Sequence, residues 1–166
     1  MSDLLRLEIL ETPIGPVSVV MSEEELVSVA FRRLATEQVT AQLSGGRPLR
    51  VISGRGLVAS RQLREYFAGE RQRFELKIAW HLAAPFQQKV LQRLAKVPFG
   101  EVTSYGDLAQ AVGSPGASRA VGGAMRSNRW PIVIPCHRVL AARGALGGFT
   151  GGLTIKRALL ELEGAL

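Results

Sequence analysis

YGDLAQAVGSPGASRAVGGAMR, residues 105–126, is the stretch that decides the fold of the C-terminal half of this chain. Its apolar spacing predicts two short helices, over 105–112 and 117–126, and Gly113-Ser114-Pro115-Gly116 supplies a tight turn between them. Helix, short glycine-bearing turn and helix is the plan of a helix-turn-helix. Because any two packed helices can share this pattern, the residues around it must decide what it does.

The second predicted helix contains two adjacent glycines, Gly122 and Gly123. Together they disfavour the helix by about 1–2 kcal/mol relative to alanine, so something should compensate. Small side chains allow close approach of the backbone, either to a neighbouring helix or to the floor of a nucleic-acid groove. A helix that reads base edges carries long polar side chains, and this one has few, so recognition of base sequence is not expected.

The single cysteine of the chain, Cys136, lies in Ile134-Pro135-Cys136-His137-Arg138-Val139. A thiol reacts as its thiolate, and cationic or hydrogen-bonding neighbours favour that form, so this segment predicts a nucleophile. In an extended segment adjacent side chains point to opposite faces, so His137 would reach Cys136 only through a water or a bend. The other histidine, His81, lies between the two halves of the chain and is expected to be structural or solvated, which argues against a cysteine protease.

A glycine-rich loop, Gly147-Gly148-Phe149-Thr150-Gly151-Gly152, precedes a predicted helix over 154–163 with Thr154 as its N-cap. The loop lacks the ending of a P-loop and the spacing of a dinucleotide fingerprint. We expect it to form a flexible wall over a pocket, offering backbone amides and the Thr150 hydroxyl to a polar ligand. At the end of the helix, Glu163 is equally compatible with an inward position beside a histidine and with solvent.

The first 84 residues predict a mixed unit. Short strands over 4–11, 17–21 and 26–31 indicate a meander, residues 44–56 are rich in loop formers, and a helix is expected over 57–68. Pro85 is expected to begin a second unit with a helix over 86–97. The predicted domains are therefore residues 1–84 and 85–166.

Charge is distributed unevenly between these halves. Residues 85–166 carry ten Lys and Arg against four Asp and Glu, whereas residues 1–84 are nearly balanced and the whole chain has a net charge of +7. A basic half is compatible with nucleic-acid binding and also with a merely soluble surface.

Composition excludes several other classes of protein. No apolar run is long enough for a membrane span, and residues 1–6 lack the pattern of a signal peptide. One cysteine forms no internal disulfide, so a cytosolic protein is expected. One cysteine and two histidines do not supply the four ligands of a structural zinc site, and no metal is expected.

Four blocks of sequence together resemble the O6-alkylguanine-DNA alkyltransferases. These blocks are Tyr105, Arg119 to Asn128, Ile134 to Val139, and Gly147 to Leu153. The resemblance is strong over 85–166 and loose over 1–84. It implies an α+β fold, with a ribonuclease H-like N-terminal domain built of a small sheet and a helix, and a winged-helix-like C-terminal domain that binds DNA and holds the active site.

The resemblance also implies a function. The protein would repair DNA by direct reversal, moving a methyl or other alkyl group irreversibly from O6 of guanine to Cys136, with O4 of thymine left open as a second substrate. The nucleotide would be rotated out of the stack from the minor groove. Each molecule would act once, as a cytosolic monomer, with double-stranded DNA as its partner and no cofactor, membrane or obligate protein partner.

By position in the family's motifs, four residues would be catalytic: Cys136 as nucleophile, His137 as base through a water, Glu163 as the residue that orients His137, and Tyr105, which would crowd the 3′ phosphate and assist protonation of the leaving guanine. Arg119 would fill the space left by the rotated nucleotide, and Asn128 would brace the turn before the active site. The expected DNA contacts are Ser104, Tyr105, Arg119, Ala120, Gly122 and Arg126, and the expected pocket residues are Asn128, Val139, Gly147, Gly148, Phe149 and Thr150.

The chain departs from the family pattern at three places. Phe149 stands where many members have tyrosine, Thr150 where many have serine, and Arg129-Trp130 where proline is common, which leaves the path of that turn undefined. The alternative function is a lesion-binding protein without activity. Members of that class carry tryptophan in place of the nucleophile, so Cys136 favours the enzyme.

Overall fold

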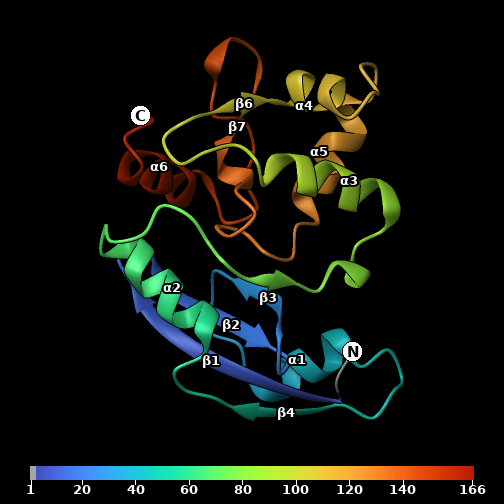
Figure 1. The fold of residues 1–166 in the computed structure, drawn as a ribbon, viewed down its shortest axis with the longest axis vertical. Helices are drawn as coiled ribbons and strands as arrows, with labels where there is room; N and C mark the ends of the chain where they lie inside the picture. Colours follow the sequence, from blue (N-terminus) through green and yellow to red (C-terminus); the bar gives the residue numbers. More distant parts are fainter. Residues whose placement is uncertain (1–2) are drawn as a thin grey trace. The chain divides into compact units, whose positions relative to one another are not determined.

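The computed structural model describes residues 3–166. The chain forms two compact units, Met1–Ala79 and Trp80–Leu166, each of which is described by itself (Figure 1). Contacts thus divide the chain a few residues before the domain boundary that the sequence predicts.

The N-terminal unit is built on a five-stranded sheet in the order β4-β1-β2-β3-β5. The expected meander is present as β1 (Leu4–Thr12), β2 (Gly15–Met21) and β3 (Glu25–Ala30), which pair antiparallel. The short strands β4 (Arg50–Ser53) and β5 (Lys77–Ile78) add parallel to β1 and β3. Alternation in β1 buries Leu5 and Leu7, whereas β2 is buried at every residue from Val17 to Met21, so the centre of the sheet is covered on both faces.

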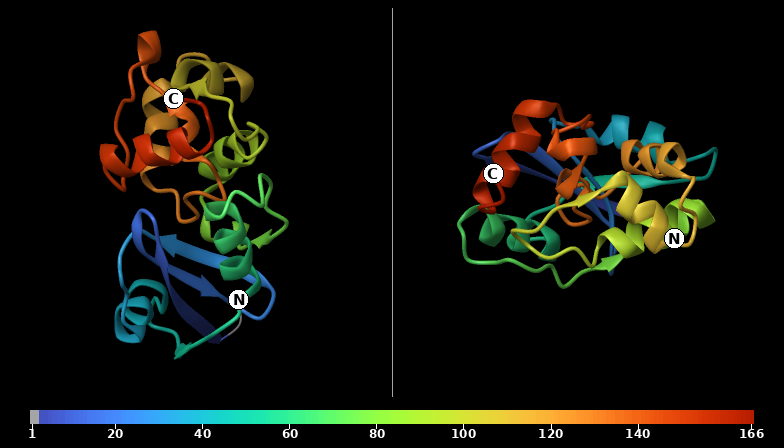
Figure 2. Two further views of the ribbon diagram at one scale, coloured as in Figure 1. Left: turned by 90° about the vertical axis from the view of Figure 1, so that its left-hand side faces the viewer. Right: turned by 90° about the horizontal axis from the view of Figure 1, so that it is seen from above.

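Two helices accompany this sheet, α1 (Thr36–Leu43) and α2 (Val58–Phe67), and they lie on opposite sides of it (Figure 2). The sequence predicts α2 within one residue at each end. It misses α1, and it misses the short strand β4, which lies within the loop-rich residues 44–56. Strand β4 is four residues long and exposes Arg50 and Ser53, so its pairing with β1, rather than a pattern of its own, makes it a strand.

The C-terminal unit is mainly helical. Its elements are η1 (Trp80–Leu82), α3 (Pro85–Leu94), β6 (Thr103–Ser104), α4 (Tyr105–Ala111), α5 (Ser118–Arg126), η2 (Cys136–Arg138), β7 (Val139–Leu140), η3 (Ala142–Gly144) and α6 (Leu153–Leu162). Helices α3, α4 and α5 pack on one another, and α6 packs against η2. The two short strands β6 and β7 pair parallel, which joins the segment after Cys136 to the start of α4.

The helix-turn-helix is formed by α4 and α5. Ser104 caps α4 by accepting a hydrogen bond from Asp107 N at 3.0 Å. Gly113 ends the helix with a φ of 79°, which favours glycine, and the amide of Ser114 returns to Ala109 O. Helix α5 buries Val121, Ala124 and Met125 against the rest of the unit.

The glycines of α5 are not explained by close packing on another helix. A Cβ at Gly122 or Gly123 would meet only the guanidinium of Arg126, at 3.8 and 3.9 Å, and no other described atom within 4 Å. Of the two explanations offered by the sequence, close packing against a neighbouring helix is therefore wrong for the part of the chain described. The glycine face of α5 is left to border a pocket.

Helix α6 begins earlier than expected. Its N-cap is Gly152, with a φ of 92°, and Thr154 lies inside the helix. A left-handed glycine lets the loop turn directly into the helix, so the prediction of Thr154 as the cap is wrong. Within residues 3–166, no helix has both the length and the apolar character needed to cross a membrane.

Candidate active site

Cys136 lies at the start of a single 3-10 turn rather than in an extended strand. The amide of Arg138 donates to Pro135 O at 2.9 Å and closes the turn, and the side chains of Cys136, His137 and Arg138 are all buried. The expectation of an extended segment is therefore wrong. The bend that the sequence allowed as an exception is present, and His137 and Cys136 are both buried in it.

The turn that leads to Cys136 is braced by Asn128. Its Oδ1 accepts from Trp130 N and its Nδ2 donates to Ile134 O, both at 2.9 Å. Trp130 is fully buried and packs edge-on against Trp80, with ring centroids 5.3 Å apart. This anchoring defines the path of the chain where the sequence departs from its family, and it explains how a tryptophan is accommodated there.

The thiol of Cys136 is deeply buried, and burial raises its pKa to about 11. A hydrogen bond with the Asn128 side chain, backbone hydrogen bonds from residues 136 and 137, and the charge of Lys156 each lower the pKa, but they do not cancel the effect of burial. At neutral pH the resting nucleophile is therefore a thiol, and its reaction needs a base to take the proton.

The residue that follows Cys136, His137, has the properties of a base. Nε2 of His137 is 2.8 Å from Oε2 of Glu163, and both side chains are fully buried. A carboxylate only accepts hydrogen bonds, so Nε2 carries the proton and Nδ1 is left with a free lone pair. Within the described residues, Nδ1 has no hydrogen-bond partner. Burial lowers the pKa of His137 more than Glu163 raises it, so the ring is neutral and able to accept a proton at neutral pH.

Glu163 also binds Arg138. The guanidinium donates to the carboxylate twice, Nε to Oε1 at 2.8 Å and Nη2 to Oε2 at 2.9 Å, and its Nη1 donates to Val97 O at 2.6 Å. Of the two positions that the sequence left open for Glu163, the structure has the inward one.

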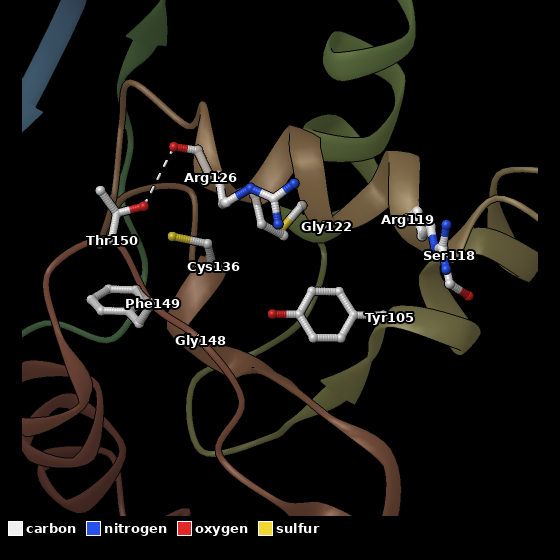
Figure 3. A pocket seen from close by; sticks show the side chains of 10 residues that line it. Tyr105, Ser118, Arg119, Gly122, Arg126, Cys136, Gly148, Phe149 and Thr150 are labelled. Carbon is white, nitrogen blue, oxygen red and sulfur yellow. Dashed lines mark hydrogen bonds between the residues drawn. The ribbon is translucent and has the colours of Figure 1, made fainter.

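The thiol opens onto a pocket of about 860 Å³, a size typical of small-molecule sites. Figure 3 shows the sulfur of Cys136 and the hydroxyl of Tyr105 on its walls, with the Phe149 ring nearby. Burial and the neighbouring Cys136 raise the pKa of Tyr105, so it is a proton donor at neutral pH. The walls are formed by Tyr105, Ser118, Arg119, Gly122, Met125, Arg126, Cys136, Gly148, Phe149 and Thr150.

Helix α5 supplies half of these residues, which joins the pocket to the helix-turn-helix. The opposite wall is the glycine-rich loop, where the Thr150 hydroxyl donates to Arg126 O at 3.4 Å. Arg119 and Arg126 line the pocket and are exposed to solvent. Ala120 is also exposed but does not line the pocket.

Several of the predicted site residues lie outside the pocket wall. Ser104 caps α4, Val139 is fully buried, and a Cβ on Gly147 would meet Ala141 Cβ at 3.3 Å. Their positions support the pocket from behind.

Lys156 belongs to the site but was not predicted from the sequence. It is fully buried, and its Nζ donates to Leu146 O, to Val139 O at 2.6 Å and to Gly148 O at 3.3 Å, so one ammonium links β7 and the beginning of the glycine-rich loop to α6. The available signal was a lysine on the otherwise apolar face of the last helix, a pattern that is also typical of a surface residue.

A thiol in a pocket beside a helix-turn-helix, with a histidine and a carboxylate behind it, defines the class of protein: one that presents a nucleophile to DNA. Comparison with known protein families identifies the class more closely. The family model of the 6-O-methylguanine DNA methyltransferase DNA-binding domain matches residues 85–165. The family model of the ribonuclease-like domain of the same proteins matches residues 5–80.

Full-length relatives agree with this match. The chain is 41% identical over 157 residues to the methylated-DNA–protein-cysteine methyltransferase of Methanosarcina acetivorans, covering 95% of this chain and 97% of the relative. The crystal structure of the Mycobacterium tuberculosis O6-methylguanine methyltransferase superimposes with a TM-score of 0.81 at 36% identity, covering 97% of this chain and 93% of that one. A structure of the mycobacterial protein in complex with DNA also has a TM-score of 0.81, at 36% identity, covering 96% and 93%.

The chain therefore belongs to the 6-O-methylguanine DNA methyltransferase family. This confirms the family resemblance, and the α+β fold with a ribonuclease-like N-terminal unit and a DNA-binding C-terminal unit is confirmed with it.

Proposed function

We propose that this protein repairs DNA by direct reversal, transferring a methyl or other alkyl group from O6 of guanine in double-stranded DNA to Sγ of Cys136. The observation that carries the proposal is the position of Cys136, with its sulfur on the wall of a pocket beside α5 and the His137–Glu163 pair behind it. Membership of a methyltransferase family and the DNA complex of a similar protein support the same reaction.

The reaction requires two proton transfers. The thiol proton moves through a bridging water to Nδ1 of His137, and Sγ attacks the alkyl carbon as the bond from that carbon to O6 breaks. The bonding electrons stay on O6, and the leaving guanine takes a proton from the hydroxyl of Tyr105, which lies on the same pocket. His137 then releases its added proton to water as Tyr105 takes one up from water, so both groups return to their resting forms. The products are guanine with its normal proton and a stable thioether on Cys136, so each molecule acts once.

DNA is held through α5. Two small residues of α5 would lie in the minor groove, the exposed Ala120 and Gly122 on the pocket wall, and the exposed Arg119 and Arg126 add positive charge. Rotating a nucleotide out of the stack requires a few kcal/mol, which contacts to the phosphates and insertion of Arg119 would offset. Tyr105, at the first turn of α4, would crowd the 3′ phosphate and favour the rotated state.

The pocket then binds the alkylated guanine between its walls. Thr150, Gly148 and Phe149 form the side opposite α5, where backbone amides and a hydroxyl offer polar contacts to guanine. A free thiol as the reacting group requires a reducing environment, and we therefore assign the protein to the cytosol.

The proposed function is tested by mass spectrometry of the intact protein after incubation with a duplex containing one O6-methylguanine. We expect one added methyl group per molecule, located on the Cys136 peptide, with guanine restored in the DNA. Tight binding to the modified duplex without a change in mass would instead indicate a lesion-binding protein.

The role of Arg119 is tested by comparing two substrates. We expect Arg119→Ala to slow transfer from duplex DNA by at least about tenfold, since about 1.4 kcal/mol less stabilisation of the rotated state has this effect. Transfer from the free base O6-benzylguanine, which needs no rotation, should change little. Arg157→Ala, which removes an exposed arginine on α6 away from the pocket, is the control. Equal losses on both substrates would remove Arg119 from this role.

A further inference from the structure

Arg138 is a buried charge in the active site to which the proposed reaction gives no role. Its guanidinium makes two hydrogen bonds to Glu163 and one to Val97 O, and only 6% of the residue is exposed. A guanidinium fork matched to a carboxylate fixes both the position and the orientation of that carboxylate. Glu163 is thus held by Arg138 from one side while it accepts from His137 on the other.

One oxygen of Glu163 is shared. Oε2 accepts from Nε2 of His137 at 2.8 Å and from Nη2 of Arg138 at 2.9 Å, while Oε1 accepts from Nε of Arg138. The negative charge that would otherwise draw a proton onto the His137 ring is therefore already balanced by a permanent positive charge. Arginine stays charged at any pH at which a protein is folded, so this balance does not change with pH.

Burial and the charged groups around His137 act on its protonation in opposite directions. Burial disfavours the imidazolium, and Glu163 favours it through a hydrogen bond and its charge. The charges of Arg138 and Lys156 oppose the imidazolium, and Cys136 is a neutral thiol at rest. Arg138 binds the carboxylate that His137 contacts, whereas Lys156 donates to the carbonyls of Val139, Leu146 and Gly148.

We propose that Arg138 is a positioning residue that holds Glu163 and balances its charge, and thereby keeps His137 as the neutral tautomer whose Nδ1 can accept the proton of Cys136. The inference rests on the proposed function in that it assigns His137 the role of base. The protonation state of His137 in the resting protein, which the inference predicts, can be measured without DNA.

The first experiment is an NMR titration of the two histidines in the protein without DNA. His81 is exposed and serves as an internal reference in every sample. In the unsubstituted protein we expect the titration midpoint of His137 to lie below 6.5, the ordinary value for histidine. In Arg138→Gln the titration midpoint of His137 should rise by about one unit or more, the size of effect expected from a neighbouring charge. Arg138→Lys retains the charge, so its midpoint should stay near that of the unsubstituted protein.

The second experiment measures the rate of methyl transfer as a function of pH. An enzyme whose base has a lowered pKa loses activity only at acidic pH. The acidic limb of the pH–rate profile of the unsubstituted protein should therefore lie below pH 6.5, the ordinary pKa of histidine. Arg138→Gln should move this limb upward, so that activity is already falling at neutral pH. A purely structural role would lower the rate by the same factor at every pH and leave the limb in place.

Controls separate these explanations. Arg157→Gln removes an exposed arginine from α6 and should change neither the midpoint nor the limb. An unchanged titration midpoint of His137 in folded Arg138→Gln overturns the proposal. An equal rise of the midpoint in Arg138→Lys also overturns it, because the charge of residue 138 would then not be the cause. If the unsubstituted protein transfers no methyl group, the proposed function fails, while the titration still decides what Arg138 does to His137.

Discussion

Cys136→Ser is expected to abolish methyl transfer completely while binding to a duplex that contains O6-methylguanine is retained. Serine keeps the shape of the side chain, but its hydroxyl is a far weaker nucleophile and holds its proton much more tightly than a thiol. The substituted atom lies on the pocket wall, whereas the expected DNA contacts come from α5 and the start of α4. Chemistry and binding should therefore separate.

This expectation is measured on one duplex in two ways, by the mass of the protein after incubation and by fluorescence anisotropy of labelled DNA. Met125→Leu is the matched control, because Met125 lines the same pocket and the substitution conserves volume. We expect the control to keep both transfer and binding. Transfer by the Cys136→Ser protein would show that another group is the nucleophile, and a loss of binding would show that the thiol itself holds the DNA.

Glu163→Gln is expected to have the largest effect on stability. The substitution leaves the buried guanidinium of Arg138 facing an uncharged amide, and removing one partner of a buried ion pair destabilises a protein by about 3–5 kcal/mol. This is a large part of the total stability of an ordinary domain. It should appear as a lower urea midpoint for the C-terminal unit.

The same substitution should slow transfer, since His137 loses the carboxylate that fixes its tautomer. The charge of Arg138 remains, so the acidic limb of the pH–rate profile should move to lower pH, opposite to the shift expected for Arg138→Gln. Glu161→Gln is the control, because this exposed carboxylate lies on the same helix two residues earlier. A stable, fully active Glu163→Gln protein would leave Glu163 as a structural carboxylate without influence on His137.

The sequence was most informative where function depends on neighbours along the chain. The turn at Gly113 predicts the helix-turn-helix within one residue at each end, because capping and glycine preferences act over a few residues. The run around Cys136 and the glycine-rich loop likewise identify the family. Helix α1 and strand β4 were missed because β4 depends on pairing with β1 and α1 on packing, neither of which has a strong local pattern.

The geometry of the site could not be obtained in this way. An extended segment was expected at Cys136, but a 3-10 turn forms there, and the 26 residues that separate His137 from Glu163 are closed to a contact of 2.8 Å. Which of two positions Glu163 takes depends on whether a buried cation meets it. Arg138 provides that cation and also reaches back 41 residues to Val97.

The sequence by itself therefore identified the family and the helix-turn-helix and predicted the nucleophile, because each of these depends on a short run of residues whose chemistry or local geometry is fixed. Only the tertiary structure decided how deeply Cys136 is buried, that its resting form is a thiol, and that Glu163 is shared by His137 and Arg138. The physical reason is that desolvation and buried ion pairs depend on which distant residues pack around a group, and the order of residues along the chain does not contain those distances.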